Sequence, residues 1–70
     1  MPSTRQDYGP PLTPWEMFVA TASRERQLQG LNAFQLIGRL EPIWTQGRNL
    51  GYTGNALLTY AIMRVRELYG

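Results

Sequence analysis

Apolar positions recur at helical spacing in three segments of the chain. The first segment predicts a helix over about residues 14–29. Thr13, Pro14 and Glu16 mark its start, because this arrangement makes a capping box with proline at the first helical position. Gly30 is a typical C-terminal stop. The apolar face covers only the first two turns and consists of Trp15, Phe18, Val19 and Ala22.

The second segment predicts a helix over about residues 33–46, with Asn32 as its N-cap. Its apolar residues cover about half the circumference, which is typical of a helix packed on two sides. They are Phe34, Leu36, Ile37, Leu40, Ile43 and Trp44. Pro42 interrupts the segment, because a proline removes the hydrogen bond to the carbonyl four residues earlier. The helix is therefore expected either to kink near Gly38 or to split and restart at Pro42.

Residues 46–55 are rich in glycine and asparagine and predict a loop. The third helix is expected over about residues 54–69, with the clearest apolar stripe in the chain. That stripe consists of Leu57, Leu58, Ala61, Ile62, Val65, Leu68 and Tyr69. The fold class expected is all-α, a single small three-helix domain over residues 13–70. Residues 1–12 hold three prolines without periodicity and predict a flexible, extended N-terminal arm.

The length of 70 residues allows one domain with a small core. Domains of this size usually gain stability from disulfides, a structural metal or association. The chain contains no cysteine and no histidine, which excludes disulfides and a zinc site. We therefore expect the chain to associate with itself, as a homodimer or higher oligomer, or with a larger protein.

Catalysis is not expected, because general acid–base and nucleophilic chemistry draws mostly on histidine, cysteine, lysine and paired carboxylates. The first three residue types are absent, and the five acids are scattered singly. We expect that the protein is not an enzyme and that it binds no cofactor and no metal. The net charge of +2 is too small by itself to indicate nucleic acid. No signal peptide and no apolar run of membrane-spanning length is visible, so a soluble cytoplasmic protein is expected.

Partner-binding candidates lie in three places. Aromatic, methionine and arginine side chains are enriched in interfaces, and the polar side of the third helix carries Tyr60, Met63, Arg64 and Arg66. Arg24 and Arg26 flank the turn after the first helix, and Tyr8 lies in the arm. The alternative is a solvated or internally packed surface. Trp15 and Trp44 are expected in the core, although either of them is suited to anchoring a partner.

The glycine-rich loop before the third helix suggests a weak anion contact. Free amides at a helix N-terminus attract anions, and the candidates here are Arg48, Gly51 and Gly54. The loop lacks the strand and the lysine that nucleotide-binding loops require. An ordinary flexible connector is the alternative.

Three hypotheses for function follow. The first is a non-catalytic protein–protein interaction module: a small adaptor, an inhibitor or a subunit of a larger assembly, of a kind common in phages and bacterial regulatory systems. The second is a small helix-turn-helix DNA-binding regulator, which three helices permit. Two features disfavour this hypothesis. The expected loop is longer than the usual turn of that motif, and the arginines of the third helix lie in its second half. The third is membrane-surface binding by the amphipathic third helix.

Overall fold

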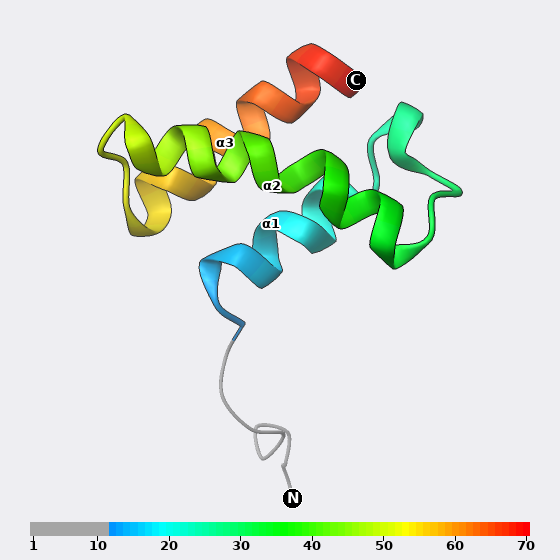
Figure 1. Cartoon of the computed structure of the whole chain (residues 1–70), viewed down its shortest axis with the longest axis horizontal. Helices are drawn as coiled ribbons and strands as arrows, with labels where there is room; N and C mark the ends of the chain where they lie inside the picture. Colours follow the sequence, from blue (N-terminus) through cyan, green and yellow to red (C-terminus); the bar gives the residue numbers. More distant parts are fainter. Residues whose placement is uncertain (1–11) are drawn as a thin grey trace, which may run out of the picture.

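The computed structural model describes residues 12–70, which form three α-helices and one short 3-10 helix and contain no strand (Figure 1). The expected all-α, three-helix class is confirmed. The third helix also has the predicted bounds. Most of the predicted N-terminal arm, including Tyr8, lies outside the described residues. In chain order the elements are α1 (Pro14–Ala22), η2 (Arg26–Leu28), α2 (Ala33–Asn49) and α3 (Gly54–Tyr69).

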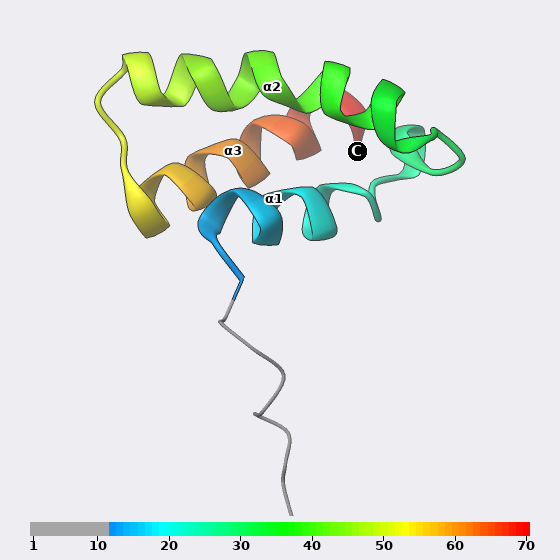
Figure 2. The ribbon, with the colours of Figure 1, turned by 60° about the horizontal axis from the view of Figure 1, so that its bottom comes forward.

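The helices form two layers, with α2 lying over α1 and α3 (Figure 2). α3 packs against both other helices, whereas α1 and α2 touch at few positions. The molecule is flat, with principal extents of 43, 31 and 18 Å and a radius of gyration of 13.7 Å. A compact chain of this length has a radius of gyration of about 11 Å. The helices therefore spread out and leave broad surfaces facing outward.

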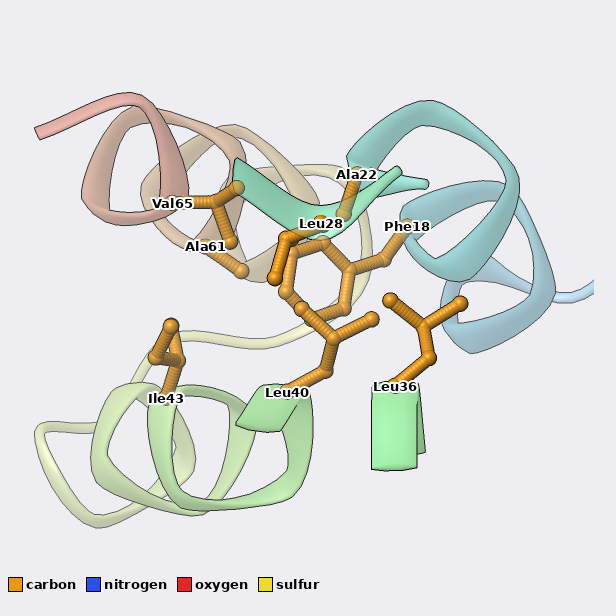
Figure 3. Packing of buried hydrophobic residues seen from close by; sticks show 8 residues of the cluster. All are labelled: Phe18, Ala22, Leu28, Leu36, Leu40, Ile43, Ala61 and Val65. Carbon is orange, nitrogen blue, oxygen red and sulfur yellow. The ribbon is translucent and has the colours of Figure 1, made fainter. Parts of the chain in front are cut away.

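The core lies between the two layers, where Leu36, Leu40 and Ile43 of α2 meet Phe18 of α1 and Val65 of α3 (Figure 3). Every buried side chain of the described residues is apolar.

Trp15 and Trp44, expected in the core, are partly buried and pack against this cluster. Their ring centroids lie 5.4 Å apart in an edge-to-face arrangement, and Trp44 stacks on Phe18 at 5.1 Å. These separations are typical of favourable aromatic pairs.

The predicted caps of the first two helices are confirmed. The Glu16 amide donates to the Thr13 Oγ1 over 3.2 Å, and the Thr13 amide donates to the Glu16 Oε1 over 2.8 Å. Asn32 and Gln35 repeat this reciprocal pattern at the start of α2, with distances of 2.8 and 3.3 Å. Each box satisfies amides that the first turn of a helix leaves without partners.

The predicted end of the first helix at about residue 29 is wrong, because α1 stops at Ala22. If the helix continued, Leu28 would lie about 80° around it from Phe18 and about 120° from Ala22, away from the core. Instead the chain turns after Ser23, and the short η2 brings Leu28 into the core, where it is 2% exposed. Burial of this leucine favours the turn over a longer helix.

Of the two outcomes expected at Pro42, the split is wrong, because α2 runs unbroken from Ala33 to Asn49. Buried residues lie on both sides of the proline, Leu40 before it and Ile43 directly after it. Their contacts with the core hold the helix together where one backbone hydrogen bond is missing. The carbonyl that loses this bond belongs to Gly38, which is exposed to water.

The predicted loop over residues 46–55 is shorter than expected, because only residues 50–53 connect α2 to α3. Gly47 belongs to α2. A Cβ atom placed on Gly47 would lie 2.6 Å from the Leu57 Cδ1 and 2.8 Å from the Tyr60 Cδ2. The glycine therefore permits close packing of α2 on α3 and does not end the helix. This connection has the length of the turn in a helix-turn-helix motif.

Candidate functional site

The candidate binding residues of this protein lie on the outside of the molecule. The described residues form no pocket, and they contain no group of three or more potential metal-ligating side chains. None of the helices in this part of the chain is long and apolar enough to cross a membrane.

The most exposed large apolar side chain is Phe34, in the first turn of α2, with 89% of its surface accessible. Ile37, one turn later, is 36% accessible. The expectation that α2 packs on two sides is therefore wrong. Its buried positions all lie on one side, whereas Phe34 lies about 160° around the helix from the buried Leu36. We call the exposed side the α2 outer face; it consists of Phe34, Ile37, Gly38, Glu41 and Thr45.

The α2 outer face also contains a backbone carbonyl that lacks its hydrogen-bond donor. Pro42 has no amide hydrogen, so the carbonyl of Gly38 lacks its helical donor. Gly38 also has no side chain to cover that oxygen. A glycine inside a helix costs about 0.5–1 kcal/mol relative to alanine. A Cβ atom at Gly38 would meet nothing within 4 Å, so packing within the chain does not explain this glycine.

Glu41 lies on the same face and is exposed. The other three acids of the described residues have partners: Glu16 caps α1, Glu25 pairs with Arg66 at 3.7 Å, and Glu67 pairs with Arg64 at 2.6 Å. Glu41 has no ion pair or hydrogen bond from a side chain of the described residues. With the Gly38 carbonyl and the Thr45 hydroxyl, it makes the face rich in hydrogen-bond acceptors.

The predicted residues of α3 differ in their surroundings. Tyr60 is partly buried, packs over Gly47 and stacks on Tyr52 with ring centroids 5.0 Å apart, so it joins α2 to α3. Met63 is 58% exposed. Arg64 donates to the Glu67 carboxylate, and this hydrogen bond raises the pKa of its guanidinium.

The structure brings one predicted arginine of α3, Arg66, to the turn that carries two others. Arg66 of α3 pairs with Glu25, which lies in the turn between Arg24 and Arg26. Arg24 and Arg26 are both exposed. The contact ties the segment after α1 to the C-terminal half of α3. The Arg66 side chain is 65% exposed, and an ion pair with a solvated partner contributes less than about 1 kcal/mol to stability.

One of the predicted anion-contact residues, Gly51, has a structural role at the end of α2. Gly51 has a φ of +99°, and its amide donates to the Arg48 carbonyl over 3.0 Å. The Tyr52 amide donates to the Gly47 carbonyl over 3.1 Å. These two bonds form a Schellman motif, which ends the helix. The amide of Gly51 is therefore engaged by the helix. Gly54 begins α3 with a φ of +54°, and Arg48 is exposed.

Sequence reasoning missed Phe34 as a surface residue, because it counted every apolar position of α2 toward the core. The signal was present in the spacing. Leu36, Leu40, Ile43 and Gly47 form one stripe at intervals of three and four residues, and Phe34 does not belong to it.

The α2 outer face thus combines apolar area with acceptors and one carboxylate, a composition suited to binding a surface that carries apolar groups and donors. Comparison with protein-family models, with curated proteins and with solved structures finds no match to this chain.

Proposed function

We propose that this chain is a non-catalytic protein–protein interaction module that binds its partner through the α2 outer face. The exposure of Phe34 carries the proposal. An aromatic side chain left 89% in water loses the favourable free energy of burial, and aromatic residues are enriched among the anchors of interfaces. Ile37 extends the apolar area along the helix. An adaptor, an inhibitor and a subunit of a larger assembly all fit this description.

The flat shape supports the same function. A helix in the outer layer of a thin molecule is covered on one side only, so its second side is available to another protein. In this chain that side carries the most exposed phenylalanine and a carboxylate without a partner in the described residues.

Site-specific photocrosslinking in the cells of origin tests the function. A benzophenone amino acid replaces Phe34 in one variant and Gln46 in a control variant. Gln46 is also exposed on α2, but it lies about 120° around the helix. The expected result is a discrete polypeptide adduct from position 34 and none from position 46. Absence of any adduct at position 34, in a variant that folds, would refute the function.

Duplex DNA binding is the second candidate, favoured by the four-residue connection Leu50–Thr53 between α2 and α3. The first two turns of α3 expose Asn55, Ala56 and Thr59, which carry no charge. A recognition helix usually presents polar and basic residues there. Titration of a labelled duplex at rising salt concentration tests whether the chain binds DNA. Phosphate contacts would give an affinity that falls steeply as the salt concentration rises.

A further inference from the structure

We infer that the partner of the α2 outer face is a second copy of this chain, paired antiparallel, α2 against α2. The inference rests on the proposed function and names its partner. Three residues of α2, Phe34, Glu41 and Arg48, are spaced by seven positions. Residues at this spacing lie almost in line along a helix, with a drift of about 20° per step. All three are exposed.

The line carries an aromatic ring at one end, a carboxylate in the middle and a guanidinium at the other end. Beside the carboxylate lies the Gly38 carbonyl, which Pro42 leaves without its helical donor. The first part of the face therefore lacks a cation and a donor, and Arg48 supplies both. Arg48 has no ion pair with the described residues, where the arginine pairs involve Arg64 and Arg66.

Antiparallel pairing brings these complementary parts together. A two-fold axis that crosses α2 at the level of Ile43 places Arg48 of the second copy at the level of Gly38. At the rise of an α-helix, Glu41 is then about 4.5 Å along the helix from that level, and Phe34 about 6 Å. The guanidinium reaches the Gly38 carbonyl and the Glu41 carboxylate, and it can lie over the ring of Phe34. The axis repeats every contact on the other side.

Parallel pairing is disfavoured by the same residues, because it places Glu41 against Glu41 and Arg48 against Arg48. The glycine also fits the antiparallel arrangement. Gly38 has open space above it in the single chain, and in the pair that space receives Arg48 of the second copy. Thr45, another small side chain, lies at the level of Glu41 of the second copy.

Sedimentation equilibrium of the full chain over a range of concentrations tests the pairing. We expect a dimer whose dissociation constant rises at least about tenfold in Phe34→Ser, Glu41→Arg and Arg48→Glu. The combined variant Glu41→Arg with Arg48→Glu exchanges the charges of the pair and should bind more tightly than either single variant, although a glutamate at position 48 cannot donate to the Gly38 carbonyl. Leu68→Ser, which changes an exposed apolar side chain of α3, is the matched control and should leave association unchanged.

Circular dichroism of each variant establishes that it folds, and the charge exchange keeps the test valid if Phe34→Ser unfolds. A chain that remains monomeric up to about 1 mM, the weak end of measurable affinity, overturns the inference. So does a dimer that both single charge reversals leave intact, or a combined variant that associates no more tightly than the single variants. If the chain is monomeric and position 34 crosslinks to a different protein, the proposed function stands and the self-pairing is refuted.

Discussion

The packing of α2 on α3 can be tested with one substitution at two positions of the same helix. Gly47 and Gly38 both lie inside α2, so replacement by alanine gives each the same gain in helix propensity, about 1 kcal/mol. Their surroundings differ. A Cβ at Gly38 enters open space, whereas a Cβ at Gly47 lies 2.6 Å from the Leu57 Cδ1 and 2.8 Å from the Tyr60 Cδ2.

The expected sign of the effect follows from these distances. Carbon atoms in contact are normally about 3.5–4.0 Å apart, so the new methyl group at Gly47 overlaps its neighbours by about 1 Å. Leu57 is 5% exposed, and the ring of Tyr60 is stacked on Tyr52, so neither can move away freely. Overpacking of this kind costs about 1–3 kcal/mol. Gly38→Ala should stabilise the fold, and Gly47→Ala should be less stable than Gly38→Ala by that amount.

Thermal unfolding followed by circular dichroism measures the difference. In a domain of this size 1 kcal/mol corresponds to about 4–8 °C in Tm, so the two variants should differ by at least about 4 °C. The melts are run at several protein concentrations, because dimerisation through the α2 outer face would make Tm depend on concentration. If Gly47→Ala raises Tm as much as Gly38→Ala, the close approach of α2 to α3 is refuted.

Three further predictions concern stability. Phe18→Ala, at a fully buried position, should cost about 3–5 kcal/mol, seen as a large loss of unfolding free energy in urea; a loss under about 1 kcal/mol would contradict the central place of this ring. Thr13→Ala removes the hydrogen bond to the Glu16 amide and should cost about 1 kcal/mol in the same assay, whereas an unchanged midpoint would mean the cap contributes nothing. Pro42→Ala restores the amide that donates to Gly38 and should stabilise α2 by up to about 3 kcal/mol, and a lower Tm would show that the proline is required for the fold.

Sequence reasoning located the helices where the local signals were strong. The capping residues Thr13 and Asn32 gave the starts of α1 and α2 correctly, because a cap is satisfied within a few residues and depends little on the rest of the chain. The bounds of α3 were correct for a similar reason. Its apolar stripe is long and regular enough to outweigh other preferences.

The incorrect predictions concern positions where contacts between residues far apart in the sequence determine the structure. The apolar face of α1 ends at Ala22, and the helix ends with it, although no glycine or proline stands there. Gly47 resembles a loop residue in the sequence, yet the helix contains it because Leu57 and Tyr60 need the space. Pro42 is typical of the end of a helix, yet α2 continues through it because Leu40 and Ile43 pack in the core on either side. Tertiary packing overrides local propensity in all three cases.

The candidate surface was harder to predict than the fold, because an apolar residue in a helix is first assigned to the core. For most apolar residues of α2 that assignment is correct. It fails at Phe34, whose angular position separates it from the buried stripe. Three features occur together on this face. They are an exposed aromatic ring, a glycine inside the helix that packing does not require, and a proline that leaves the carbonyl of that glycine without a donor. The glycine and the proline each lower the stability of the helix, and the exposed ring forgoes the favourable free energy of burial. Their occurrence on one face is explained if a second protein surface covers that face. The contacts with that surface would then supply the stability that the single chain lacks.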